Sequence, residues 1–137
     1  MAYIEAVVVV YIRRLISFQD LSTLPISSIE SLLRDHHLLF EEQTREAATI
    51  IMLIAVAVLS GRDIKERAAS FLWCFGLWDI FYYVFLKIWT GWPRSPIDMD
   101  VLFLIPAPWV SPVIVPVIIS LIMAGIAIFL FRSSKDK

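Results

Sequence analysis

Long apolar blocks alternate with short polar segments along the chain, and their lengths predict helices that cross a bilayer. The clearest block, residues 68–89, contains FLWCFGLWDIFYYVFLKIW. About 22 residues at 1.5 Å each are enough for a hydrocarbon core of about 30 Å. Residues 2–18 form a shorter first block and residues 112–131 form the last one. We expect all three to span the membrane.

The second helix is predicted to be longer than a bilayer is thick. Residues 26–60 contain neither glycine nor proline, and Ser60-Gly61 then supplies a stop signal. Ser27 and Glu30 have the spacing of a capping box at its start. We predict one continuous helix, or two nearly collinear ones, between these signals. Its first half is amphipathic and lies on or outside the membrane, whereas its second half is embedded.

The connections between the later blocks have turn chemistry. Residues 61–67, GRDIKER, form a charged loop, and residues 91–100, GWPRSPIDMD, contain two prolines. Residues 101–110, VLFLIPAPWV, are apolar but too short to span, so we expect an interfacial or re-entrant segment there. Pro112 fits the first position of the last helix behind a Ser111 cap.

Composition agrees with a membrane protein. The chain is 59% hydrophobic and 18% charged, whereas soluble domains are about 45–50% apolar and about 25% charged. A net charge of -1 gives no basic footprint for nucleic acid. Cys74 alone excludes an internal disulfide and a multi-cysteine metal motif. The predicted fold is therefore all-α and polytopic, a single domain over residues 1–137. It has four transmembrane helices, the second of them long, and a short interfacial or re-entrant segment before the fourth.

Basic residues predict the orientation, because they concentrate in short cytoplasmic loops. Residues 61–67 and the tail at residues 132–137, RSSKDK, hold three basic residues each, whereas residues 91–100 hold only Arg94. With four spans, both termini then lie in the cytoplasm. Arg13 and Arg14 fall on the outer side in this arrangement, which counts against it.

Ionisable residues inside apolar blocks are the candidate functional residues, because a charge within the bilayer is costly unless it is paired or sheltered. Asp79 lies near the middle of residues 68–89, with Tyr82 and Tyr83 about one helical turn further along. The predicted buried polar cluster comprises Glu5, Arg13, Glu42, Glu46, Asp79, Tyr82, Tyr83 and Lys87.

Three interpretations of this cluster stay open. In a structural one, Arg13 or Lys87 pairs with a glutamate, while Asp79 bonds a tyrosine hydroxyl or stays protonated. In a second, the carboxylates bind a metal or a quinone, although the Glu-x-x-His repeat of di-iron bundles is absent. In a third, the acidic face is a proton or ion pathway. The metal candidates are Glu42, Glu46, Asp79 and His37.

Several segments resemble those of a group of small bacterial four-helix membrane proteins: YIEAVVVVYIR, REAATIIML, FGLWDIFYYVFLK, GWP and LFLIPAPWVSPVIVP. The resemblance covers most of the chain, and the series WDIFYY, GWP, LFLIP and PW is its most specific part. It implies the four-helix topology and a bacterial inner membrane, and it assigns no role to any residue.

We expect a non-catalytic accessory or assembly subunit of a larger membrane complex. The chain has little extramembrane bulk and no recognised catalytic motif, and its apolar surface suits packing against other helices. The expected partners are the lipid bilayer and other membrane subunits or a second copy, without nucleic acid. The alternatives are a metal- or quinone-binding membrane enzyme and a proton or ion pathway, and the cofactor stays open.

Overall fold

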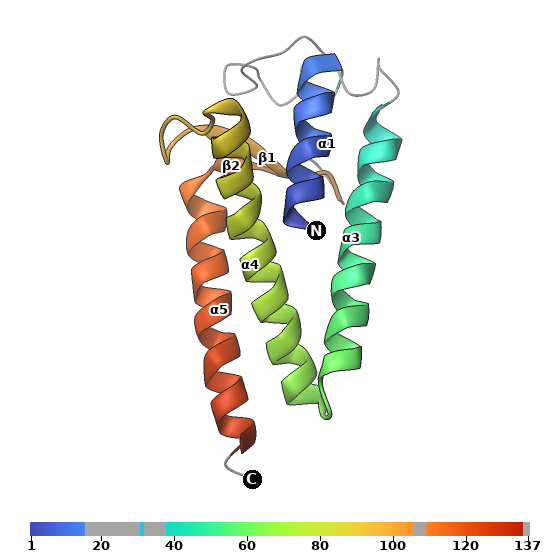
Figure 1. The fold of residues 1–137 in the computed structure, drawn as a ribbon, viewed down its shortest axis with the longest axis vertical. Coiled ribbons are helices and arrows are strands. Elements are labelled where there is room, and N and C mark those ends of the chain that lie inside the picture. Colours follow the sequence, from blue (N-terminus) through green and yellow to red (C-terminus); the bar gives the residue numbers. More distant parts are fainter. Residues whose placement is uncertain (16–30, 32–37, 106–108, 136–137) are drawn as a thin grey trace.

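The structure is a computed structural model that describes residues 1–15, 31, 38–105 and 109–135. This part of the chain is mostly helical. Figure 1 shows α4 beside α5 on one side and beside α1 and α3 on the other, with both strands near one end of the bundle. The elements are α1 (Ala2–Leu15), α3 (Leu38–Ser60), α4 (Ile64–Thr90), β1 (Met99–Phe103), β2 (Trp109–Pro112) and α5 (Ile114–Lys135).

Three helices are long and apolar enough to cross a membrane. They are the segments Phe40–Ser60, Ile64–Thr90 and Ile114–Ser134, which confirms the predicted long apolar helices and agrees with a membrane protein. By contrast, α1 has 14 residues and extends about 21 Å at the helical rise, less than the hydrocarbon thickness of about 30 Å. It lies beside only one half of the bundle (Figure 1). The fourth span therefore stays a prediction.

The predicted long second helix is described as a continuous helix only from Leu38 onward. α3 covers the end of that prediction and stops at Ser60, where the N–H of Gly61 bonds the carbonyl of Ala57 at 3.2 Å. The Ser27 and Glu30 capping box lies outside the described residues, as does most of the amphipathic first half. The continuity of the helix from residue 27 is therefore untested.

The connection between α3 and α4 is shorter than the predicted loop over residues 61–67. Asp63 caps α4 by accepting the backbone N–H of Glu66 at 2.8 Å, and the Glu66 carboxylate accepts the N–H of Arg62 at 2.9 Å. The first bond satisfies a donor that the first helical turn leaves unpaired, and the second holds the residue before the cap against the helix. α4 therefore begins at Ile64, within the segment predicted as loop.

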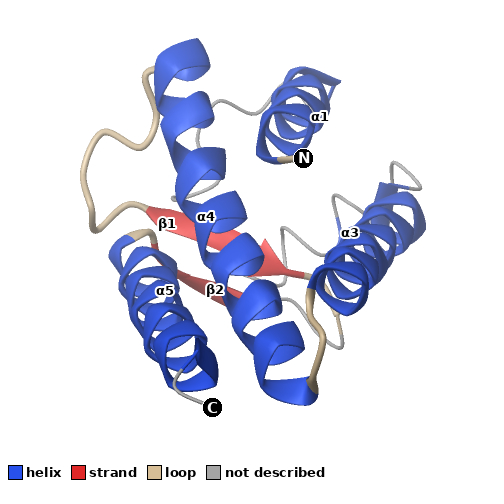
Figure 2. Ribbon diagram, turned by 60° about the horizontal axis from the view of Figure 1, so that its bottom comes forward, coloured by secondary structure: helices blue, strands red, loops and turns tan. Residues whose placement is uncertain are grey.

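The segment predicted as interfacial or re-entrant forms a β-hairpin. β1 and β2 pair antiparallel, with Asp100 opposite Ser111 and an irregularity between Val101 and Phe103. Figure 2 shows the strands crossing behind α4 between α5 and α3. The fold class is thus mostly α with a small two-stranded sheet that the sequence analysis did not predict.

The start of α5 also differs from the prediction. Pro112 ends β2, and α5 begins at Ile114 rather than at Pro112. The backbone N–H groups of Val113 and Ile114 bond the carbonyls of Asp98 and Pro96, both at 2.9 Å. Because the preceding loop thus pairs with the N–H groups at the start of α5, a serine cap is not needed there.

α4 and α5 pack most closely where α4 has no side chain. A Cβ at Gly76 would lie 2.7 Å from the backbone oxygen of Ser120. Ala69 on α4 and Ala127 on α5 are fully buried. Small residues of this kind allow membrane helices to approach each other closely. The sequence therefore places α5 directly against α4.

On the opposite side of α4, α1 packs through side chains that are larger than those between α4 and α5. Ala6 and Val10 of α1 form a buried core with Leu86 of α4. At the same level, the ring of Tyr3 makes edge contacts with Phe85 and Trp89, with ring centroids at 5.4 and 5.3 Å. This packing sets the height of α1 in the bundle, and with it the height of Glu5.

Candidate functional site

Arg45 of α3 pairs with two carboxylates, Glu42 of the same helix and Glu5 of α1. The pair with Glu5 joins the two helices. The Nε of Arg45 lies 3.1 Å from both carboxylate oxygens of Glu42, and its Nη2 lies 2.7 Å from Glu42 Oε2. Its Nη1 forms an ion pair with Glu5 of α1. The hydroxyl of Thr49 donates to the other oxygen of Glu5. The guanidinium fork is suited to such two-sided pairing because it presents five donors in one plane.

These carboxylates are buried, which makes their pairing necessary. Glu5 and Glu42 are 7% and 8% exposed, and Thr49 is 2% exposed. A buried charge is stable only when a counter-charge and hydrogen bonds replace its hydration. The spacing within α3 explains the geometry, since residues three and four apart lie on one face of a helix. We call Glu5, Glu42, Arg45 and Thr49 the arginine network.

Glu46, on the next position of the same helix, binds the hairpin. Both of its carboxylate oxygens accept the backbone N–H of Leu104, at 3.1 and 3.0 Å, and Gln43 Nε2 donates to the carbonyl of Leu104 at 3.3 Å. Glu46 is 8% exposed and Leu104 is 4% exposed. α3 therefore supplies partners for main-chain groups that follow the end of β1.

A second set of polar contacts joins α4 to its other neighbours. Ser120 of α5 donates a hydrogen bond of 2.7 Å to Asp79 Oδ2. Tyr83, 6% exposed, hydrogen-bonds Asp100 of β1, which is 4% exposed. Each contact joins α4 to a different element, the first to α5 and the second to β1. Polar side chains at such interfaces add stability to membrane bundles.

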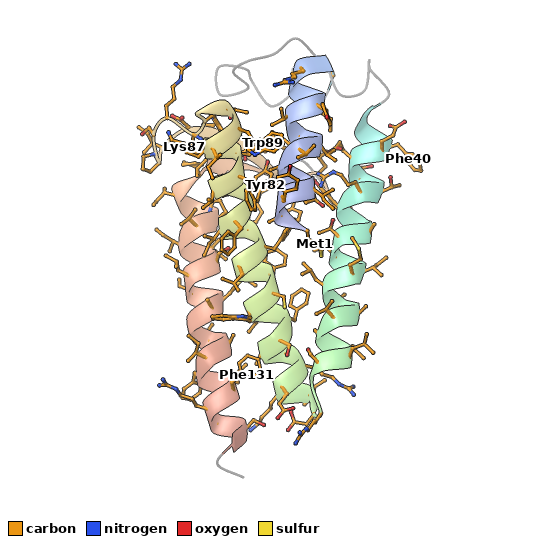
Figure 3. All side chains as sticks on the ribbon, viewed as in Figure 1. Met1, Phe40, Tyr82, Lys87, Trp89 and Phe131 are labelled. Carbon is orange, nitrogen blue, oxygen red and sulfur yellow. The ribbon has the colours of Figure 1, made fainter. Side chains whose placement is uncertain are left out.

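The side chains of Asp79, Tyr82 and Tyr83 therefore contact three different elements and do not form one cluster. In the structural interpretation Asp79 bonds a tyrosine hydroxyl or stays protonated, whereas in the structure it accepts a hydrogen bond from Ser120. Tyr82 packs against the core between α1 and α4, and Figure 3 shows it between these two helices. The reason is helical geometry, because successive positions on a helix point about 100° apart. One turn of α4 thus reaches α5, α1 and β1.

Lys87 does not belong to the buried cluster in which the sequence analysis placed it. Its side chain is exposed, and its Nζ donates to the carbonyls of Gly91 at 3.1 Å and Pro93 at 2.5 Å. Gly91 ends α4 in the left-handed conformation, with φ of 73°. A cation in the last turn of a helix is placed to bond the carbonyls there.

The metal candidates are not brought together. Glu42 and Glu46 turn to Arg45 and Leu104, while Asp79 turns to α5. Within the described ranges, no group of three or more His, Cys, Asp or Glu side chains is placed to hold a metal ion. His37 and the side chain of Arg13 lie outside the described part of the chain, so their roles are untested.

The sequence analysis missed Arg45, Ser120 and Asp100 as partners in these contacts. Arg45 carried a signal, because it follows Glu42 by three positions on a predicted helix. Ser120 carried another, as the one hydroxyl residue in the last apolar block. Asp100 carried none, since its position was assigned to a turn.

Comparison of the chain with protein-family models, with curated proteins and with solved structures gives no match. The residues and their geometry are therefore the basis for inferring a function.

Proposed function

We propose that the protein is a non-catalytic accessory or assembly subunit of a larger membrane complex. One observation carries this proposal: several polar side chains in and beside the spans are bonded to other elements of the same chain. Arg45 ties α1 to α3, Glu46 ties α3 to the hairpin, and Ser120 ties α5 to α4. Groups used in this way act as connections between helices. In this proposal the carboxylates connect helices and take part in no reaction.

The outward face of α5 supports contact with another helix. Gly125 is exposed, and nothing lies within 4 Å of a Cβ built on it. Leu121, Ile122 and Phe129, on the same helix, are also exposed. Glycine allows two membrane helices to come close enough for their backbones to pack. We infer that a helix of a partner subunit packs at Gly125.

The proposed topology places the α3–α4 turn and the end of α5 on the cytoplasmic side of a bacterial inner membrane. These two parts of the chain lie at one end of the bundle, where Ser134 donates to Glu66 Oε1 at 3.2 Å (Figure 1). The basic residues of residues 61–67 and of Arg132 gather there, as the positive-inside rule favours for a cytoplasmic end. In this topology α1 is the fourth membrane-embedded helix, and the N-terminus points toward the same side.

The proposal is tested on protein purified in a mild detergent from its own membrane. Mass spectrometry of co-purifying proteins and elemental and absorption analysis are made on one sample. We expect a partner subunit in stoichiometric amount. Gly125→Leu should reduce the amount of that partner, whereas Ala48→Leu, a similar enlargement at an exposed position of α3, should leave it unchanged. Stoichiometric iron, manganese or quinone without a partner would instead favour the membrane enzyme.

A further inference from the structure

A hollow opens between α4 and α5 near the end of the bundle that carries the C-terminus. Its volume is about 230 Å³, and it is lined by Trp73 of α4 and by Ile128, Phe131 and Arg132 of α5. Figure 3 shows Phe131 at this lower end. Three of the four lining side chains are hydrophobic and one is a cation. The hollow thus has an apolar wall and one charged corner.

The charged corner lies where the hydrocarbon should end. From Ile114 to Phe131 the helix α5 contains no charged residue, and this stretch extends about 27 Å along the helix axis. Arg132 is the first charge beyond it. Since the hydrocarbon core is about 30 Å thick, the Arg132 guanidinium is at the level of the lipid head groups, while the side chains of Ile128 and Trp73 are at the level of the acyl chains.

Arg132 is available to an outside anion. Its side chain is exposed, and among the residues that the structure describes it forms no ion pair or hydrogen bond. Two acidic residues described at this end of the bundle are engaged elsewhere: Asp63 accepts the backbone N–H of Glu66, and Glu66 accepts from Ser134 and from the backbone of Arg62. The guanidinium therefore retains donors in the geometry that binds phosphate well.

We propose that this hollow binds one anionic phospholipid of the cytoplasmic leaflet. The phosphate pairs with Arg132, and an acyl chain lies against Trp73 and Ile128. Basic pockets between transmembrane helices on the cytoplasmic side bind anionic head groups in this manner. The volume is below the range of about 300–1,000 Å³ of sites that enclose a whole drug-sized ligand, so the hollow holds part of one chain and leaves the rest in the bilayer. This inference rests on membrane residence and on the proposed topology, and not on the accessory role.

The test is a lipid titration of the full chain followed by native mass spectrometry. Phosphatidylglycerol and phosphatidylcholine with identical acyl chains are added separately to delipidated protein in detergent. We expect one phosphatidylglycerol to bind more tightly than phosphatidylcholine. Arg132→Gln should weaken phosphatidylglycerol binding about fivefold, which is the loss of about 1 kcal/mol that one basic residue contributes near an anionic head group. Ile128→Trp, which fills the hollow, should abolish the tight binding.

Lys65→Gln is the matched control, because it removes an exposed cation at the same end of the bundle without touching the hollow. Its affinity for phosphatidylglycerol should equal that of the unmodified chain. The proposal is overturned by equal binding of the two lipids, by equal losses in Arg132→Gln and Lys65→Gln, or by unchanged binding in Ile128→Trp.

Discussion

The carboxylate of Glu46 accepts the backbone N–H of Leu104 with both oxygens, at 3.1 and 3.0 Å. The two residues are 58 positions apart, and the contact joins the upper part of α3 to the hairpin. This contact gives the backbone N–H of Leu104 a hydrogen-bond acceptor one residue beyond the end of β1. A hairpin at the end of a bundle is thereby fixed to a helix that does not precede or follow it directly in the sequence.

Glu46→Ala is expected to loosen the hairpin. The change leaves the buried N–H of Leu104 without an acceptor, which costs about 1–3 kcal/mol. Hydrogen exchange of the Leu104 amide in detergent should become faster, while exchange in the middle of α5 should not change. Glu46→Gln retains one acceptor oxygen and should have a smaller effect. Glu41→Ala, an exposed change on the same helix, is the control. Unchanged exchange of Leu104 in Glu46→Ala would refute this role.

Gly76→Ala is expected to push α4 and α5 apart. Its Cβ would meet the backbone oxygen of Ser120 at 2.7 Å, and overpacking of this kind costs about 1–3 kcal/mol. Gly125→Ala meets nothing within 4 Å, so it provides a matched control on α5. Thermal unfolding in detergent should show a lower midpoint for the first variant only. Equal midpoints would mean that the two helices do not approach each other as described.

Asp79→Asn is expected to leave stability nearly unchanged, because the amide oxygen still accepts from Ser120. Asp79→Leu and Ser120→Ala should each cost about 0.6–1.7 kcal/mol, the range of interhelical hydrogen bonds in membranes. The measurement is unfolding by titration with sodium dodecyl sulfate in mixed micelles. A large loss in Asp79→Asn would show that the negative charge itself is needed, as a proton pathway or a metal site requires.

The α3–α4 turn and the end of α5 are expected on one side of the membrane. Single cysteines at positions 62 and 135, in a chain with Cys74→Ala, should react with the same membrane-impermeant reagent in inverted vesicles and not in intact cells. A cysteine at position 94 should react from the other side. Labelling of positions 62 and 135 from opposite sides would contradict the proposed topology.

The sequence predicts the long helices well because bilayer-length apolar runs are a strong signal. It does not predict the hairpin, because residues 99–112 lack the alternation of apolar and polar positions that indicates a half-buried strand. It also assigns Asp63 and Glu66 to a loop, although their spacing is that of a helix cap. Asp63 and Glu66 thus carry a capping signal that the high charge of residues 61–67 conceals.

The site is predictable in part for a similar reason. The sequence analysis placed Glu5, Glu42 and Glu46 in the predicted buried polar cluster, and the structure buries all three. The partners of Glu5 and Glu46 on other elements are not predictable, since contacts across 40 or more residues depend on how the helices pack. Lys87 shows the limit clearly, because its position at a helix end decides its partners more than its charge does.

The ion pair of Glu5 and Arg45 holds α1 against α3 in the upper part of the bundle, and a double-mutant cycle on these two residues measures its contribution. Arg45→Met leaves two buried carboxylates unpaired, and breaking a buried pair costs about 3–5 kcal/mol. The lower end applies, because 24% of the Arg45 side chain is exposed. Glu5→Leu, Arg45→Met and the double variant are unfolded in mixed micelles, with Glu5→Leu and Lys65→Gln as a distant control pair. We expect a coupling energy of at least about 1 kcal/mol for Glu5 and Arg45 and none for the control pair. Additive losses within about 0.5 kcal/mol for Glu5 and Arg45 would contradict it.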